Sequence, residues 1–140
     1  MERRIINGLP DARVMGGSYA TRWEGWKNPS RRSLPGTSIQ VRPRHPLDIC
    51  DALYDGDVGC YSIMYKSSTS SLWVAYIGYS RVLRKEIPLK LKHFDHYESH
   101  TARYRVSVIQ IPNSSVAKAY EYDLIRYYTP PWNVRYSKQA

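Results

Sequence analysis

The apolar positions in the second half of the chain fall into three runs that predict β-strands. Residues 58–66 and 72–78 are apolar runs joined by a polar Ser/Thr turn, which predicts an antiparallel hairpin. From Tyr104 to Ile111, apolar residues recur at alternate positions, and this period of two predicts a third strand. The three strands are expected to form one small, mostly antiparallel sheet.

Helical signals lie between the second and third strands. Ser80 can cap a short helix over residues 81–87. Pro88 is predicted to end this helix, because proline lacks a backbone N–H and clashes with the preceding turn. The basic, His-rich segment 89–102 fits either a helix or a loop.

The last helix has the clearest pattern. A cap at Asn113-Ser114 begins it, and it runs to about Tyr128, before Pro130-Pro131. The order strand, strand, helix, strand, helix predicts an α+β domain in which helices flank a three-stranded sheet. The face of the last helix that would pack on the sheet carries Val116, Tyr120, Leu124 and Tyr127.

The first part of the chain shows no sustained period. Residues 1–57 are predicted to be a basic extension rich in Pro, Gly and Arg, and residues 58–140 to be the folded domain. Aromatic and basic residues of the extension contact DNA by stacking and phosphate binding, or pack on the core with the arginines in solvent, and both can hold together. The extension could also support oligomerisation. The residues of the extension that are candidates for DNA contact are Trp23, Trp26, Arg31 and Arg32.

Charge narrows the possible partners. The chain of 140 residues has a net charge of +9, and residues 1–47 hold nine Lys and Arg against three acidic residues, a local charge of +6. This surplus favours a polyanion such as nucleic acid.

No apolar run approaches the roughly 20 residues of a transmembrane helix, and no apolar signal peptide opens the chain, so a cytoplasmic protein without a membrane partner is expected. Cys50 and Cys60 are expected to be free thiols.

Several short motifs occur in order along the second half. Arg84 lies eight residues after Tyr76, in the short predicted helix, and Glu121 lies in the last helix. No motif is specific by itself, so their joint occurrence carries the information. The motifs are Gly59-Cys60-Tyr61, Tyr76-Ile77-Gly78, Glu121-x-x-Leu124-Ile125 and Pro130-Pro131-Trp132-Asn133.

Over residues 58–134 the chain resembles the GIY-YIG nuclease family, which has a three-stranded antiparallel sheet flanked by helices. The two name-giving tripeptides of the family lie on the first two strands. The block 76–87 is especially similar to nucleases of the phage endonuclease II type. The chain departs from the family at Cys60, which replaces the usual Ile, and in the longer hairpin loop 67–71. A buried Cys behaves as a small apolar residue, so the first departure is compatible with the fold.

The resemblance implies roles for five residues. Glu121 would be the single carboxylate that binds Mg²⁺ or Mn²⁺, and Arg84 would bind the scissile phosphate. Tyr61 would be the general base toward the attacking water, which requires nearby cations to lower a phenol pKa of about 10. Tyr76 would orient phosphate or water, and Asn133 would hold the chain after the last helix by side-chain hydrogen bonds.

Family members supply one more His or Lys between the arginine and the third strand, and here several residues are candidates. His93 and His96 are carried forward as candidate catalytic residues. His96 and His100 also have the helical spacing of zinc ligands, although the sequence offers no convincing third ligand nearby. Arg81 and Lys85 are expected to contact DNA. The full set of candidates for the missing member is Lys90, Lys92, His93, His96 and His100.

We therefore expect a Mg²⁺-dependent endonuclease that hydrolyses double-stranded DNA to 5′-phosphate and 3′-hydroxyl ends. Its sequence preference is expected to be loose, as in a phage nuclease, or short, as in a restriction enzyme. It would act in the cytoplasm of a bacterial or phage-infected cell. Two-strand cutting with one site per chain implies a homodimer or tetramer. The alternative is a non-catalytic nucleic-acid-binding module that keeps the same fold.

Overall fold

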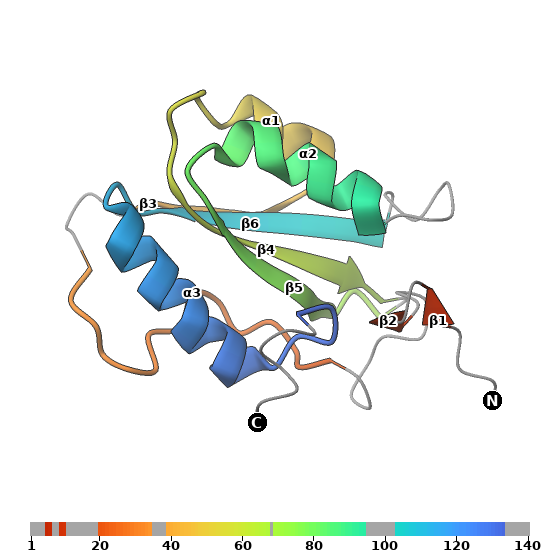
Figure 1. The fold of residues 1–140 in the computed structure, drawn as a ribbon. Coiled ribbons are helices and arrows are strands. Elements are labelled where there is room, and N and C mark those ends of the chain that lie inside the picture. The colour runs from red at the N-terminus through yellow and green to blue at the C-terminus, as the bar shows by residue number, and fades with distance from the viewer. Residues whose placement is uncertain are drawn as a thin grey trace.

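The protein is an α+β structure built on one four-stranded antiparallel sheet in the order β3-β6-β4-β5 (Figure 1). The computed structural model describes residues 5–6, 9–10, 20–34, 39–67, 69–94 and 103–133. The strands of this sheet are β3 (Ile39–Arg44), β4 (Gly59–Lys66), β5 (Leu72–Ser80) and β6 (Tyr104–Gln110), while β1 (Ile5–Ile6) pairs with β2 (Leu9–Pro10). The helices are α1 (Pro46–Asp51), α2 (Leu83–Phe94) and α3 (Ser114–Tyr128).

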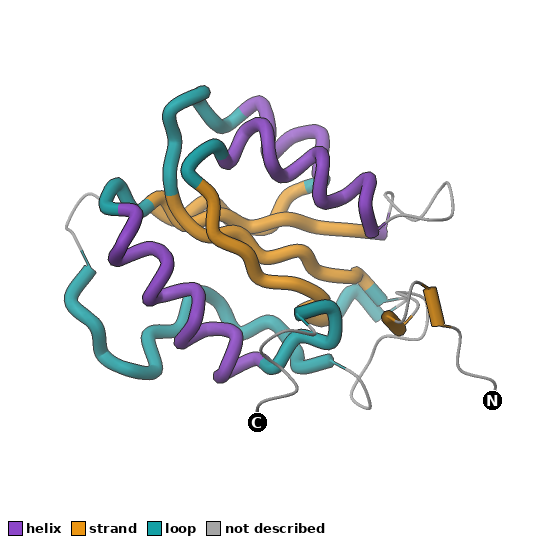
Figure 2. Tube along the Cα trace, viewed as in Figure 1, coloured by secondary structure: helices purple, strands orange, loops and turns teal. Residues whose placement is uncertain are grey.

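The sheet lies between two helical layers. Helices α1 and α2 cover one face and α3 covers the other, as Figures 1 and 2 show. Neighbouring residues of β4 point to opposite faces: Tyr61 joins the apolar core with α1 and α2, and Cys60 joins the core with α3. The tripeptide at the start of β4 therefore contributes to both cores.

The three predicted strands are present, and β5 continues to Ser80. The expectation of a three-stranded sheet is wrong, because β3 adds a fourth strand beside β6. Four of its six residues are exposed and it includes Pro43, so the short alternation of Ile39, Val41 and Pro43 with polar residues is a weak strand signal. An outer strand with one irregular step, between Val41 and Arg44, gives little hydrophobic signal in the sequence.

Residues 39–53 belong to the same folded unit as the later strands. Helix α1 follows β3, and Ile49 is fully buried in the core that Tyr61 and Ile87 share. Leu53, just after α1, is also buried there. The second half of the predicted extension is therefore part of the domain, and no boundary at residue 57 separates it.

Helix α2 is longer than predicted and passes through Pro88. It begins at Leu83. Just before this start, the hydroxyl of Ser80 accepts a hydrogen bond from the N–H of Val82 (2.9 Å). It ends at Phe94 rather than at Ile87. Apolar residues on both sides of the proline pack into the core, and this burial outweighs the lost backbone hydrogen bond. These residues are Leu83, Ile87, Leu91 and Phe94.

Helix α3 has the predicted bounds and cap. The side chain of Asn113 accepts a hydrogen bond from the N–H of Val116 (3.0 Å). The helix ends at Tyr128, and the following Thr129 caps it with a left-handed backbone (φ 44°) and an N–H that donates to the Ile125 carbonyl. Among the described residues, no helix is long and apolar enough to cross a membrane.

Candidate active site

The ring of Tyr61 lies across the backbone of Gly78 on the neighbouring strand. The two residues are directly opposite in the β4–β5 ladder. A Cβ atom on Gly78 would lie 2.5 Å from Cζ and 2.6 Å from the hydroxyl oxygen of Tyr61. The glycine of the second tripeptide therefore makes room for the tyrosine of the first, which is fully buried.

The Tyr61 hydroxyl donates a hydrogen bond to Oε2 of Glu86, at 2.6 Å. Burial raises the pKa of Tyr61 well above its usual value, and the neighbouring Tyr76 and the bond to Glu86 raise it further. The phenol is therefore held neutral. A role for Tyr61 as general base requires a lowered pKa, and the environment of Tyr61 does the opposite.

Tyr76 lies between this buried hydroxyl and the protein surface. Its ring centroid is 6.0 Å from that of Tyr61 and 4.9 Å from that of Phe94. The Nζ atom of Lys90 lies over the same ring, 5.4 Å from its centroid. Tyr76 and Lys90 are both half-buried, so this end of the group reaches solvent. Tyr61, Tyr76, Glu86 and Lys90 are called the tyrosine cluster below.

Glu86 is not among the residues that the sequence pattern singles out, and Lys90 is one of the five candidates for the missing His or Lys. Both lie on one flank of α2, because residues four apart in a helix share a side. Ile87, beside them in the sequence, marks the buried face of the helix. A polar pair at this spacing, next to a buried stripe and following a tyrosine-bearing strand, is the sequence signal that could have identified them.

Arg84 lies on the other flank of α2, away from the tyrosine cluster. Its Nη1 is 3.5 Å from Oδ1 of Asp55, in the loop after α1, and the two side chains are 48% and 95% exposed. Its charge also acts on Cys50 of α1. The structure therefore does not bring Arg84 to Tyr61. The two neighbouring cations, Arg81 and Lys85, are exposed.

Among the candidates for the missing His or Lys that the structure describes, Lys90 is the one whose side chain lies over the ring of Tyr76. Lys92 and His93 are exposed, and the ring of His93 lies 5.1 Å from that of Phe94. His96 and His100 lie outside the described residues.

Glu121 lies on the α3 side of the sheet. It is half-buried and close to Cys60, whose thiol donates to the Ala117 carbonyl at 3.1 Å. Burial raises the pKa of Cys60, and the charge of Glu121 adds to that rise. Because Tyr61 faces the opposite way from Cys60, the sheet separates Glu121 from the tyrosine cluster.

The candidate metal ligand on the α3 side is the carboxylate of Glu121. Within the described ranges, no group of three His, Cys, Asp or Glu residues could hold an ion. The half-buried carboxylate of Glu121 fits Mg²⁺, which keeps several waters and is commonly bound through one or two carboxylates plus substrate phosphate. The same arrangement does not fit zinc, which requires three or four protein ligands.

The chain after α3 crosses the outer edge of β5 and is held there. The side chain of Asn133 accepts a hydrogen bond from the N–H of Ile77 (2.8 Å) and donates one to its carbonyl (2.7 Å). The N–H of Trp132 bonds the Ala75 carbonyl, and its ring stacks on Phe94 at 4.6 Å. This is the tethering predicted for Asn133, and it ties the tail to the strand that carries Tyr76.

The segment 20–34 runs beside α3 (Figure 1). Its tryptophans pack against the core on that side of the sheet. The Trp23 ring stacks on Tyr128 with centroids 5.4 Å apart, and the Trp26 indole N–H donates to Oγ of Ser107 at 2.9 Å. The Tyr128 hydroxyl donates to the Gly25 carbonyl. These contacts correspond to the packing alternative for Trp23 and Trp26, whose rings are half-buried against the core on the α3 side.

The two arginines of this segment differ. Arg32 forms an ion pair with Asp123 of α3 at 2.9 Å, and its Nε donates to the same carboxylate oxygen. Arg31 is exposed. Of these two arginines, Arg32 has an acidic partner, whereas Arg31 presents its charge to solvent and has no acidic partner among the described residues.

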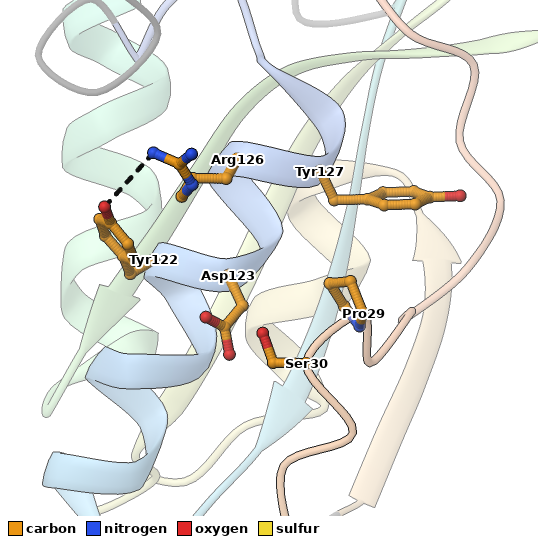
Figure 3. Close-up of a pocket in the computed structure, with 6 residues that line it drawn as sticks. All are labelled: Pro29, Ser30, Tyr122, Asp123, Arg126 and Tyr127. Atoms are coloured by element: carbon orange, nitrogen blue, oxygen red, sulfur yellow. Dashed lines mark hydrogen bonds between the residues drawn. The ribbon is translucent and has the colours of Figure 1, made fainter. Parts of the chain in front are cut away.

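A pocket of about 350 Å³ lies where this segment meets α3 (Figure 3). Arg126 donates to the Tyr122 hydroxyl at 3.4 Å, and the Tyr127 hydroxyl donates to Glu24. The pocket lies on the α3 side, so it is separate from the tyrosine cluster. Its lining residues are Pro29, Ser30, Tyr122, Asp123, Arg126 and Tyr127.

Replacing Gly78 with alanine is expected to displace the Tyr61 ring and to lower the free energy of unfolding by about 1–3 kcal/mol, the usual range for overpacking. Urea unfolding of Gly78→Ala, Tyr61→Ala and the double variant measures the coupling between the two sites. Because the clash needs the Tyr61 ring, the penalty of Gly78→Ala should vanish in the Tyr61→Ala background. Equal penalties in both backgrounds would show that the ring does not occupy this space.

Comparison with models of known protein families, with curated proteins and with solved structures finds no match to this chain.

Proposed function

We propose that the protein is a Mg²⁺-dependent endonuclease that hydrolyses double-stranded DNA to 5′-phosphate and 3′-hydroxyl ends. The observation that carries the proposal is the tyrosine cluster: a buried Tyr61 bonded to Glu86, with half-exposed Tyr76 and Lys90 at the surface. Hydroxyl, ammonium and carboxylate groups held together at a strand edge are suited to acid–base work on a phosphodiester.

Each group has a distinct role in this proposal. Lys90 binds the scissile phosphate as a positive point charge, in place of the more distant Arg84. Tyr76, at the surface, orients the attacking water. Glu121 holds Mg²⁺, which supplies charge stabilisation to the leaving oxygen when bound.

The outer position of β5 allows both faces of the sheet to serve one substrate. Asn133 and Trp132 cover the edge of β5 at Ile77 and Ala75. Tyr79 lies two residues further on, opposite Cys60 in the ladder, so its backbone has the same outward orientation as that of Ile77. In this proposal a DNA strand crosses the edge of β5 at Tyr79, beyond the part that Asn133 and Trp132 cover, and so meets the α2 side and the α3 side together.

The surface charge fits this substrate. The chain has a net charge of +9, and Arg81 and Lys85 are exposed near the start of α2. Arg31 is exposed on the α3 side. We propose that these cations contact the DNA backbone, and that a homodimer or tetramer in the cytoplasm of a bacterial or phage-infected cell cuts both strands.

The direct test is plasmid cleavage in Mg²⁺ by the wild type and by Glu121→Gln. Glu121→Gln is expected to reduce the cleavage rate at least about 100-fold, the size typical of removing a group that stabilises transition-state charge. Asp48→Asn, a matched change on the exposed side of α1, is the control and should cut at the wild-type rate. Equal cutting by Glu121→Gln and the wild type, or no cutting by the wild type, would refute the proposal.

A second candidate is a nucleic-acid-binding module without catalysis. The observation in its favour is that Arg84 and Glu121 lie away from the tyrosine cluster, on another flank of α2 and on the other face of the sheet. Such a module would bind DNA with strong salt dependence and would cut none in Mg²⁺. The cleavage assay therefore separates the two candidates.

A further inference from the structure

The pocket between the segment 20–34 and α3 has a neutral floor and a positively charged rim (Figure 3). Asp123, in its floor, is half-buried, and the ion pair with Arg32 at 2.9 Å balances its charge. Arg126, on the rim, is exposed and has no acidic partner among the described residues. A ligand suited to this pocket is therefore anionic at the rim and uncharged over the floor.

The positive charge continues along the solvent-facing side of α3. Lys118 and Arg126 are both exposed and lie eight residues apart, with exposed Tyr122 midway between them. At a rise of 1.5 Å per residue, the two cations are separated by about 12 Å along the helix. One DNA strand carries a phosphate for about every 3.4 Å of the duplex axis, so a strand that follows α3 offers a phosphate to each cation.

The turn that carries Arg31 is held in one shape beside this pocket. The Asn28 side chain donates to the Arg32 carbonyl (2.7 Å) and accepts from the Arg32 N–H (2.9 Å). Arg31 has a left-handed backbone (φ 50°), which residues other than glycine seldom adopt. Its side chain is exposed, and it directly follows Ser30, which lines the pocket. The turn therefore places a guanidinium in solvent next to the pocket at a position where glycine would fit more easily.

Tyr127 forms one wall of the pocket, and its ring is held in place. Its hydroxyl donates to Oε1 of Glu24, and its ring lies edge-on to that of Tyr128 with centroids 5.0 Å apart. Tyr127 is nevertheless 42% exposed, so part of the ring surface faces the pocket opening. A fixed aromatic surface beside a neutral floor suits the apolar face of a sugar.

We propose that this pocket and its rim cations bind the sugar–phosphate backbone of one DNA strand. Phosphates bind Lys118 and Arg126 along α3 and Arg31 at the turn, and a deoxyribose lies over the floor against Tyr127. The inference rests on the proposed function for the choice of DNA as the polyanion, whereas the binding itself needs neither Mg²⁺ nor cleavage. Glu121 lies in the same helix between the two cations, so one strand can meet all three residues.

The experiment measures the binding of a short fluorescein-labelled duplex by anisotropy, in EDTA and over a series of salt concentrations. Arg126→Gln and Arg31→Gly are each expected to raise Kd about tenfold, the size of one charged hydrogen bond. Each should also reduce the magnitude of the slope of log K against log salt by about 0.9, and the double variant by about 1.8. Arg42→Gln removes the same charge from an exposed position on β3, and this matched control should keep the wild-type slope.

Two further comparisons separate binding from folding. Arg31→Gly should keep or raise the thermal midpoint while it weakens binding, because glycine adopts the left-handed backbone readily. Tyr127→Phe keeps the ring and should bind DNA like the wild type. Tyr127→Ala should bind about threefold more weakly, the effect of losing about 25 Å² of apolar contact with a sugar.

Equal salt slopes for Arg126→Gln, Arg31→Gly and Arg42→Gln would overturn the site, and plasmid cleavage by the wild type would then leave the proposed function standing. A duplex bound through these residues and not cut in Mg²⁺ would keep the site and overturn the nuclease. No binding by the wild type overturns both. Displacement of the duplex by polyglutamate at an equal concentration of charge would identify a surface for acidic protein and overturn the assignment to DNA. If Arg31→Gly lowers the thermal midpoint, Arg126→Gln decides between the same outcomes.

Discussion

Replacing Gly59 with alanine is expected to lower the free energy of unfolding by at least about 3 kcal/mol, the upper end of the overpacking range. A Cβ atom at this position would lie 2.0 Å from the backbone oxygen of Ile109 and 2.9 Å from Cα of Gln110. These atoms belong to β6, whose backbone cannot retreat without breaking the ladder with β4. Urea unfolding followed by circular dichroism measures the loss.

Gly56→Ala is the matched control. Gly56 lies three residues earlier in an exposed loop, and a Cβ atom there would meet nothing within 4 Å. Its effect should stay within about 0.5 kcal/mol, as for surface substitutions in general. A small and equal effect for the two alanines would contradict the close approach of β4 and β6 at Gly59.

Asn133→Ala is expected to destabilise the fold by about 2–4 kcal/mol. The change leaves the N–H and the carbonyl of Ile77 without their side-chain partners, and each unsatisfied buried group costs about 1–3 kcal/mol. The tail that carries Trp132 should also detach from the edge of β5, which exposes the ring stacked on Phe94. Thermal unfolding gives the cost, and the rise in solvent-exposed tryptophan fluorescence reports the detachment.

Asn133→Asp sharpens this test through its pH dependence. A carboxylate keeps the acceptor for the Ile77 N–H but faces the Ile77 carbonyl, so the folded state raises the pKa of the introduced carboxyl above its unfolded value of about 3.9. The protonated acid can donate as the amide does. Relative to the wild type at the same pH, the variant should therefore be most stable near pH 4 and lose stability as pH rises toward 7. A loss independent of pH would contradict the two-bond geometry, and Asn113→Ala, a helix cap worth about 1 kcal/mol, sets the scale.

Strands β4, β5 and β6 and helix α3 could be predicted from the sequence because each has a local signal. The bounds of β4 and α3 follow from apolar runs and from the Asn113 cap, and the structure confirms them. Helix α2 could not be bounded in this way, because its continuation past Pro88 depends on core contacts that no local rule contains. Strand β3 left only a weak signal, because its alternation covers six residues, includes a proline and buries no residue fully.

The candidate site shows the same division. The two tripeptides and Asn133 could be identified from their order, and the structure gives their glycines and the asparagine definite packing and hydrogen-bond roles. Position along α2 did not show which cation faces the tyrosines. Arg84 and Lys90 lie in the same helix, and only its rotation against β5 turns Lys90 toward Tyr76 and Arg84 toward Asp55.

The sequence by itself determined the α+β class, three of the strands of the main sheet, the last helix and the basic character that suggests a polyanion. Only the tertiary structure decided that Tyr61 is buried and bonded to Glu86, that Trp23 and Trp26 pack inward, and that Glu121 lies across the sheet. The physical reason is the separation along the chain of the residues that set each property. Periodicity, caps and charge are set by neighbours in the chain, whereas burial, pKa and the facing of side chains are set by residues distant in the chain and close in space.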